Sequence, residues 1–254
     1  MVTTRSNTAS RGKSRRSNAG LTLVELLIII AVIGVLTALL MPMCCSRGGV
    51  RSIRTLCLTR IKILNLGVYN YATENRDRLP QMQPDNWLWD MPVAVAGALQ
   101  TNGTQQKEFY DPAFQEMSAM WNSGTNSNRP YRTIGYTLTF PGTAGLIQSN
   151  SNPAIVPQPM VITGVVLPEF NPARRVSIAG ATISVSGEGK VTNRTSNHYT
   201  GIQVGNFKAR SAHLDSSGKM PTGDNVAMLD GSGQWRKFTN MIPRTTRNSP
   251  VFWW

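Results

Sequence analysis

An uninterrupted apolar run near the N-terminus constrains this chain more than any other feature. Residues 21–41 read LTLVELLIIIAVIGVLTALLM, with Glu25 as the one charged residue and no Lys, Arg, Asn, Gln or Pro. As an α-helix the run would extend for roughly 32 Å, which matches a bilayer hydrocarbon core of about 30 Å. It is longer than the roughly 7–15 apolar residues of a cleaved secretory signal. We therefore expect residues 21–42 to form a transmembrane helix.

The segment before this run is a basic leader, residues 1–20. It contains no acid and five basic residues, Arg5, Arg11, Lys13, Arg15 and Arg16. Positively charged flanks tend to stay in the cytoplasm, so the leader predicts a cytoplasmic N-terminus and an external C-terminal part. Further basic residues follow the apolar run between positions 47 and 62, which makes the charge asymmetry small.

Glu25 is unusual because a carboxylate inside a bilayer is expensive. At the centre of a membrane helix it costs on the order of 2.5–3.5 kcal/mol, and less near an end. Two explanations are open from the sequence. Glu25 lies close enough to the interface to stay hydrated, or a positive charge meets it within an assembly.

The residues around Glu25 carry a family resemblance. Gly20-Leu21-Thr22-Leu23-Val24-Glu25, after a basic leader, resembles the cleavage and methylation signature of type IV prepilins and type II secretion pseudopilins. The resemblance implies that a prepilin peptidase cuts after Gly20 and that the new amine of Leu21 is methylated. It also implies that Glu25 pairs with the freed amine of a neighbouring subunit. Leu21 replaces the commoner Phe, whereas Pro42 stands where pilins often carry proline. An uncleaved signal anchor on an unrelated periplasmic enzyme is the alternative for this end.

Residues 43–78 are predicted to extend the helix with one apolar face. The apolar residues recur at spacings of three and four, which is typical of a helix that packs on a domain: Ile53, Leu56, Cys57, Ile61, Leu64, Val68 and Tyr71. The helix should end near Asn75–Asp77, because Leu79-Pro80 cannot continue it well. Together with residues 21–42 it would form the long helix of a pilin.

A narrower resemblance comes from Cys57 to Gly67 and from Tyr71 to Asn75. These runs are similar to a group of pseudopilin-like proteins that is abundant in planctomycetes. The resemblance implies a second cysteine that would form a disulfide with Cys57, but this chain has Asp111 in the corresponding place. It also implies Asp where this chain has Gly180. Cys57 would then be a small core residue, and the adjacent Cys44 and Cys45 could be acylated or pair between subunits.

Residues 79–254 have the texture of a β-rich domain. Strands are expected over 132–140, 160–167, 175–185 and 201–207, and Asp230-Gly231 predicts a hairpin between 225–229 and 234–238. A helix is expected over Pro112–Met120. The apolar tail, residues 251–254, should dock on the domain or form a subunit contact. The predicted fold class is α+β, with a long N-terminal helix packed on a C-terminal antiparallel sheet.

Motifs for enzyme chemistry are missing from the sequence. It has no Walker-type phosphate loop, no H-E-x-x-H pair and no Cys/His cluster, so we expect no enzyme, no cofactor and no metal. Asp215, Asp224 and Asp230 lack the spacing of a calcium loop and are better explained as turn residues. His198 and His213 are expected in loops or at the surface.

The formal net charge of +13 limits the choice of partners. The basic residues after the leader are scattered, so a solvated surface and attraction to anionic inner-membrane lipid explain most of them. The function predicted is a structural subunit of a type II secretion pseudopilus or a type IV pilus-like filament, with prepilin peptidase and other subunits as partners. The alternative is a membrane-anchored binding module, a minor pilin that binds DNA or another extracellular ligand.

Overall fold

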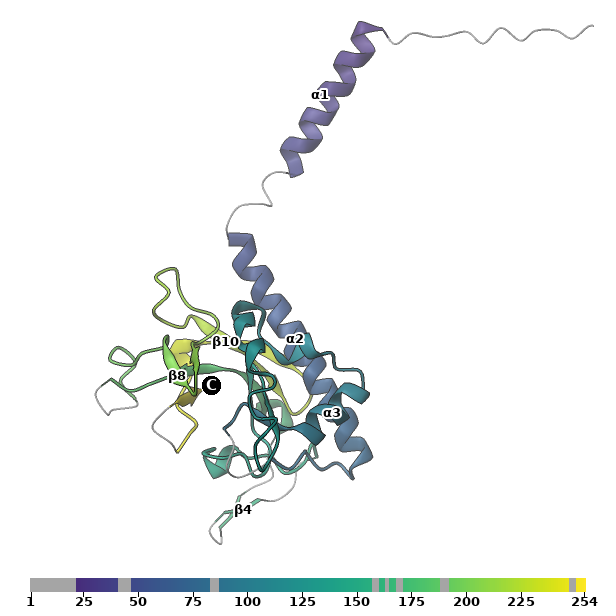
Figure 1. Ribbon diagram of the computed structural model, residues 1–254. Helices are drawn as coiled ribbons and strands as arrows, with labels where there is room; N and C mark the ends of the chain where they lie inside the picture. The colour runs from purple at the N-terminus through teal and green to yellow at the C-terminus, as the bar shows by residue number, and fades with distance from the viewer. Residues whose placement is uncertain are drawn as a thin grey trace, which may run out of the picture. The chain divides into compact units, whose positions relative to one another are not determined.

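The computed structural model describes residues 22–40, 47–82, 87–156, 160–162, 165–167, 171–187, 192–246 and 250–254 (Figure 1). The chain divides after Gly48 into two units, and each is described by itself.

The N-terminal unit contains one described helix, α1 (Leu23–Leu40). Its sequence has no polar face, so apolar side chains lie on every side of the helix. The large ones from Leu23 to Leu36 are exposed. No helix in the described part of the chain combines the length and the apolarity that a membrane span requires. Leu21 and residues 41–42 of the expected span lie outside the described residues.

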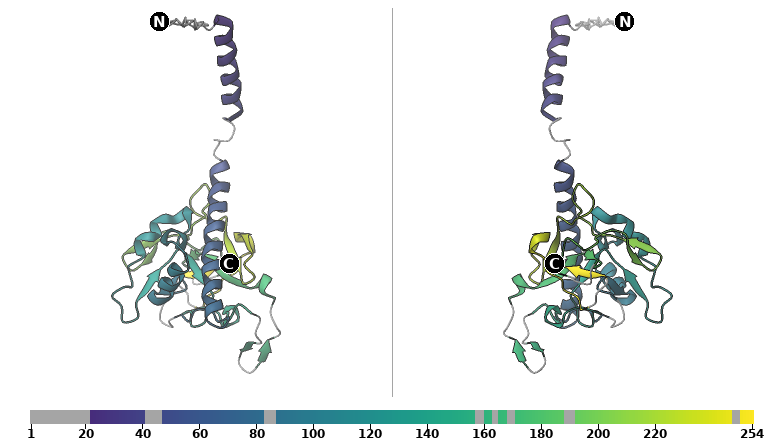
Figure 2. Two further views of the ribbon diagram at one scale, coloured as in Figure 1. Left: turned by 90° about the vertical axis from the view of Figure 1, so that its right-hand side faces the viewer. Right: turned by 90° about the vertical axis from the view of Figure 1, so that its left-hand side faces the viewer.

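The second unit is built around α2 (Arg47–Glu74), which Figure 2 shows from two sides. The predicted apolar face is confirmed at its centre, where Cys57, Ile61, Leu64 and Val68 are fully buried. Ile53 and Leu56 were also expected on that face, yet they are 39% and 45% exposed. The first half of α2 therefore extends beyond the part of the domain that covers its apolar face.

The helix ends where the sequence predicts. Arg76 and Asp77 have left-handed φ angles of 58° and 62°, which a helix cannot continue through. Residues 41–46, across which the single long helix was expected to run, lie outside the described residues.

A four-stranded antiparallel sheet, in the order β11-β10-β6-β3, forms the centre of the domain. Its strands are β3 (Tyr136–Leu138), β6 (Val176–Gly180), β10 (Gly223–Met228) and β11 (Gly233–Lys237). All six residues of β10 are buried, and the Asn65 amide of α2 donates to the Met228 carbonyl at 3.0 Å. The α+β fold class is therefore confirmed, with α2 packed on the sheet.

The predicted strand segments exist, but most are divided. The segment 132–140 contains β2 (Tyr131–Thr133) and β3, and 175–185 contains β6 and β7 (Thr182–Ser184). The segment 160–167 is not one strand but the antiparallel pair β4 (Met160–Ile162) and β5 (Val165–Leu167). The Asp230-Gly231 hairpin is confirmed by the pairing of β10 with β11.

Three short antiparallel pairs complete the described sheets: β1 (Asp90–Pro92) with β2, β7 with β12 (Val251–Trp253), and β8 (Ile202–Val204) with β9 (Phe207–Ala209). The helix α3 (Val93–Thr101) was not expected from the sequence. The segment Pro112–Met120 is helical as expected, but it is a 3-10 helix, η3, with a kink at Phe114.

The C-terminal tail docks on its own domain. β12 pairs with β7 in the register Phe252↔Ile183, and every residue from Val251 to Trp254 is at most 2% exposed. The structure thus favours docking on the domain over the alternative of a subunit contact.

Candidate functional site

The N-terminal signature is described only in part. Gly20 and Leu21, the expected cleavage and methylation positions, lie outside the described residues. Glu25 lies in the first turn of α1, where its Oε2 accepts from the Thr22 backbone N–H at 2.8 Å and the Thr22 hydroxyl at 2.9 Å. The Glu25 N–H donates to Thr22 Oγ1 at 3.2 Å. This is a capping box, so Glu25 has a partner within its own chain that the sequence reasoning overlooked, although its T-x-x-E pattern is readable.

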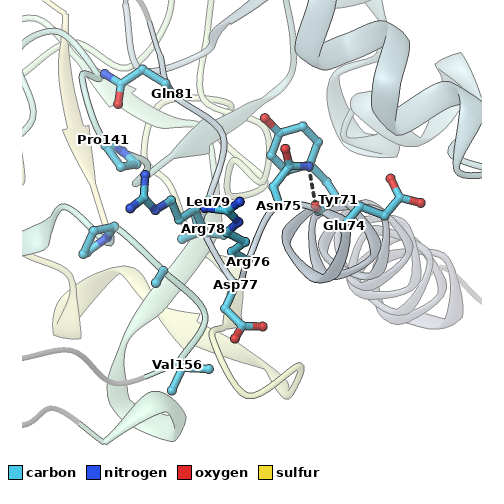
Figure 3. A pocket seen from close by; sticks show the side chains of 12 residues that line it. Tyr71, Glu74, Asn75, Arg76, Asp77, Arg78, Leu79, Gln81, Pro141 and Val156 are labelled. Atoms are coloured by element: carbon cyan, nitrogen blue, oxygen red, sulfur yellow. Dashed lines mark hydrogen bonds between the residues drawn. The ribbon is translucent and has the colours of Figure 1, made fainter.

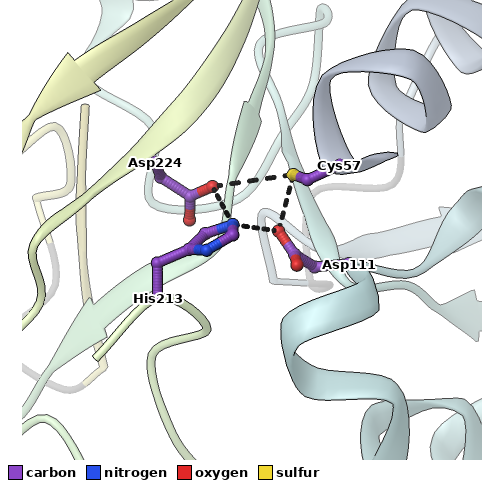
Figure 4. Close-up of side chains that lie close together, drawn as sticks. All are labelled: Cys57, Asp111, His213 and Asp224. Atoms are coloured by element: carbon purple, nitrogen blue, oxygen red, sulfur yellow. Dashed lines mark hydrogen bonds and ion pairs between the residues drawn. The ribbon is translucent and has the colours of Figure 1, made fainter. Parts of the chain in front are cut away.

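A second candidate site is a cluster of four buried side chains, which we call the buried cluster: Cys57, Asp111, His213 and Asp224. They come from α2, the start of η3, the loop before β10, and β10 itself (Figure 4). One potential ligand atom from each residue lies within 4.8 Å of the other three. The sequence separation between Cys57 and Asp224 hides this arrangement from any motif search.

The contacts within the buried cluster are short. The Cys57 thiol lies 2.8 Å from Asp111 Oδ2 and 4.0 Å from Asp224 Oδ1. His213 Nε2 lies 3.1 Å from the same oxygen of Asp111 and 3.7 Å from the same oxygen of Asp224. One oxygen of each carboxylate therefore faces both the thiol and the imidazole.

Local structure positions both carboxylates. Asp111 precedes Pro112 and caps η3, with its Oδ1 accepting from the Ala113 N–H at 2.7 Å. Asp224 Oδ2 accepts from the Thr182 hydroxyl at 3.2 Å, and its Oδ1 also accepts from the Asn225 N–H at 2.8 Å. These donors fix the orientation in which each carboxylate faces the cluster.

Burial and mutual charge shift all four pKa values. Burial, together with the charge of Asp111, raises the pKa of Asp224 to about 7. Burial and both carboxylates raise the pKa of the Cys57 thiol well above its usual value. Burial opposes ionisation of Asp111 and His213, but their hydrogen bond and opposite charges outweigh it, lowering the pKa of Asp111 and raising that of His213. These shifts favour a neutral Cys57 thiol and the charged forms of His213 and Asp111.

The cluster corrects two sequence predictions. His213 is buried rather than at the surface, and Asp224 is fully buried in β10 rather than in a turn. The other expectations are confirmed: Asp215 and Asp230 accept from the backbone N–H groups of Ser217 and Ser232 in turns, and His198 is exposed. An isolated His or Asp carries no sequence signal of burial, which explains both errors.

Two departures from the planctomycete-type pattern meet at the cluster. The sequence placed Asp111 where a cysteine partner of Cys57 would stand, and the two side chains are in contact. A Cβ added to Gly180, where that pattern has Asp, would collide with the carboxylate of Asp224. The space of a side chain at position 180 is thus filled by Asp224.

A surface hollow of about 1000 Å³ lies where α2 ends (Figure 3). Its charged lining residues are Glu74, Arg76, Asp77 and Arg78, whose formal charges cancel. The hollow therefore lacks the excess of positive charge that a nucleic-acid phosphate would require.

The comparisons with known proteins concern the N-terminal end. A family model described as the prokaryotic N-terminal methylation motif matches residues 15–41. The searches of curated proteins and of solved structures find no match. The matched range contains Gly20, Leu21 and Glu25, the residues that carry the predicted signature. The narrower planctomycete-type resemblance stays a prediction. With this motif at residues 15–41, the chain carries the N-terminal signature of type IV prepilin-like proteins.

Proposed function

We propose that this chain is a structural pilin-like subunit, cleaved after Gly20 by a prepilin peptidase and assembled through residues 21–42 into a type II secretion pseudopilus or a type IV pilus-like filament. The methylation motif at residues 15–41 is the observation that carries the proposal. Such a motif implies processing by a peptidase and assembly with other pilin subunits.

The apolar character of α1 supports this role. Its side chains offer apolar surface in every direction, and a helix of this kind needs apolar neighbours on all sides. Inner-membrane lipid would provide them before assembly, and the corresponding helices of other subunits would provide them afterwards. In this proposal the subunit is anchored once, with a cytoplasmic N-terminus and a periplasmic C-terminal domain.

The proposal assigns no catalysis to the chain itself. The one cluster of nucleophilic and basic groups that we describe is closed to solvent, since Cys57 and Asp224 are at most 1% exposed and His213 is 7% exposed. A substrate would have no access to the thiol or the imidazole.

Cleavage after Gly20 is the first test. Gly20 allows the backbone to approach a membrane-embedded peptidase closely, so we expect Gly20→Val to block processing. Co-expression with a prepilin peptidase should shorten the parent chain by about 2 kDa, since 20 of the 254 residues of a 27.9-kDa protein are removed. Intact-mass spectrometry would show the shift and the added methyl group.

Gly34→Ala is the matched control, because a Cβ at Gly34 meets nothing within 4 Å. This variant should be processed like the parent. A parent protein that still begins at Met1 in the presence of an active peptidase would contradict the proposed function.

A further inference from the structure

The buried cluster has the composition of a metal site rather than of a protein core. Cys57, Asp111, His213 and Asp224 offer one sulfur, one imidazole nitrogen and two carboxylate oxygens around a common centre (Figure 4). We propose that these four residues bind one divalent transition-metal ion of the zinc type, which fastens α2 to the β-sheet domain.

The spacing of the four atoms fits a tetrahedral centre. Bonds of roughly 2.0–2.3 Å to N, O and S ligands place tetrahedral ligand atoms roughly 3.3–3.8 Å apart. The contacts of Asp111 Oδ2 with Cys57 Sγ and His213 Nε2 are 2.8 and 3.1 Å, and those of Asp224 Oδ1 are 4.0 and 3.7 Å. These distances bracket the tetrahedral range, so small side-chain rotations would open the centre for an ion.

The contacts outside the cluster are those of ligand carboxylates. Metal-binding side chains are usually oriented by hydrogen bonds from a second layer of residues. Asp111 is held by the Ala113 N–H through Oδ1, which leaves Oδ2 directed at the centre. Asp224 is held by the Thr182 hydroxyl through Oδ2, and its Oδ1, which also accepts the Asn225 N–H, faces the centre.

Tyr136 supplies a second observation beside the cluster. It is fully buried on β3, and its hydroxyl lies within reach of the Cys57 side chain. Yet that hydroxyl makes no hydrogen bond of acceptable geometry to any residue that the structure describes. A buried hydroxyl left unsatisfied is costly. Metal binding would turn the Cys57 thiol into a thiolate, which accepts hydrogen bonds readily.

The charges balance around a dication. A thiolate and two carboxylates carry three negative charges, of which a divalent ion cancels two. Arg54 provides a further positive charge nearby: its guanidinium lies 4.1 Å over the Trp235 ring, and the Trp235 ring is nearly perpendicular to the His213 imidazole at a centroid distance of 5.0 Å. The ion would thus remove most of the repulsion among the buried acids.

The donor set selects the kind of metal. Calcium takes six to eight oxygen ligands and magnesium an octahedral oxygen shell, which a thiol and an imidazole do not provide. Mixed sulfur, nitrogen and carboxylate donors in fourfold coordination suit zinc. All four ligand residues are at most 7% exposed, so no open position remains for substrate, and the site would be structural.

The position of the site explains its role. It joins three parts of the domain that are far apart in the chain: α2, η3, and β10 together with the loop before it. It lies where the resemblance would place a disulfide between residues 57 and 111. A metal held by Cys57 and Asp111 would fasten the same two segments without a second cysteine.

The experiment uses the full-length protein in detergent, purified without chelators. Inductively coupled plasma mass spectrometry should find about one zinc ion per chain. After removal of the metal by a chelator, added Co²⁺ should produce a sulfur-to-cobalt charge-transfer band and tetrahedral d–d bands, and added Zn²⁺ should raise the melting temperature.

Three variants locate the site. Cys57→Ser should abolish the charge-transfer band, and Asp224→Asn should weaken zinc binding by about 100-fold or more. Thr182→Val changes only a second-layer hydrogen bond and should weaken binding by about 10–100-fold. Asp215→Asn and Asp230→Asn alter turn aspartates outside the cluster, one half-buried and one exposed, and should bind metal like the parent.

Two results would overturn the proposal. The first would be a parent chain that contains no zinc, gives no charge-transfer band with Co²⁺ and melts at the same temperature with and without Zn²⁺. This result does not depend on the folding of any variant. Alternatively, metal binding is unchanged in Cys57→Ser and Asp224→Asn, or is lost in Asp215→Asn.

Discussion

At the scale of single residues, Glu25 has two competing partners. In the described chain it closes a capping box with Thr22 at the start of α1. In the proposed filament it neutralises the freed amine of a neighbouring Leu21. Cleavage after Gly20 would leave Thr22 as the second mature residue. The Thr22 groups and the freed amine would then both belong to the first two residues of a mature chain.

Substitutions at Glu25 separate the two roles. Gln preserves a capping box but carries no charge, whereas Ala loses both functions. If charge pairing drives assembly, Glu25→Gln and Glu25→Ala should both reduce filament incorporation by about tenfold or more, since each ~1.4 kcal/mol lost is a factor of ten. The measurement is the fraction of processed subunit that sediments with filaments. Parent-like incorporation of Glu25→Gln would argue for capping alone.

Asp90 is a buried carboxylate outside the cluster. It accepts from the Trp87 N–H at 3.0 Å and from the Thr133 hydroxyl at 2.8 Å, which ties the start of β1 to β2. Burial outweighs these two hydrogen bonds and raises the pKa of Asp90 from 3.8 to about 6. The folded state therefore holds a proton that the unfolded chain releases at lower pH.

This shift predicts the sign of a pH dependence. Between pH 4 and pH 6 the folded state binds more protons at Asp90, so its contribution to the free energy of unfolding falls as pH rises and is constant above about pH 6. The total fall is about 3 kcal/mol at most. The difference in unfolding free energy between the parent and Asp90→Asn, from urea titrations at several pH values, should show this slope. A difference that does not change with pH would contradict the raised pKa.

At the scale of elements, periodicity identified α2 and its buried centre but not how far its burial extends. Ile53 and Leu56 fit the apolar stripe as well as Ile61 and Leu64 do, yet they are partly exposed. Conversely, Asn65 is buried because its amide reaches the Met228 carbonyl at 3.0 Å. Which turns of a helix face the domain depends on the domain's dimensions, and these are not encoded in the helix.

Two leucines that are two residues apart, and so point to roughly opposite sides of the helix, test the packing of α2. Leu64 is fully buried and Leu66 is 60% exposed. Leu64→Ala should lower the free energy of unfolding by about 2–5 kcal/mol through lost apolar burial and a cavity. Leu66→Ala, the control, should change it by less than about 0.5 kcal/mol. Equal effects in chemical denaturation would mean that the helix packs on another face.

The predicted strands are divided where the chain changes its hydrogen-bond partner. Between β2 and β3, the Ile134 N–H donates to the Trp89 carbonyl and the Gly135 N–H to the Phe109 carbonyl, so the chain changes partners there. After β6 the chain moves from β3 and β10 to β12 as its partner. An apolar run predicts extended backbone but cannot show where one partner is exchanged for another.

At the scale of the whole molecule, the C-terminal residues complete the core. Phe252 packs edge-on against Trp89 with ring centroids 4.9 Å apart, and the Trp253 indole donates to Ser184 Oγ at 2.8 Å. Residues near a chain end are usually dispensable. Here the last four residues bring three buried aromatic rings from the far end of the sequence into the domain.

Removing residues 251–254 should therefore destabilise the domain by more than about 3 kcal/mol, the lower limit for deleting one buried aromatic side chain. The measurement is thermal and urea unfolding of the chain that ends at residue 250, compared with the parent. Deleting residues 1–20 is the control, because the domain is formed by residues 49–254. A truncated chain that unfolds like the parent would show that the tail is not part of the stable core.

The sequence alone determined the features that depend on neighbouring residues. The methylation motif, the helices over 23–40 and 47–74 and the Asp230-Gly231 hairpin all follow from local pattern and turn chemistry. Only the tertiary structure decided the position of Cys57, Asp111, His213 and Asp224, because residues up to 167 positions apart meet through strand pairing and helix packing. Burial then shifts their pKa values and makes them candidates for one metal ion, and burial is a property of the folded whole rather than of any single residue.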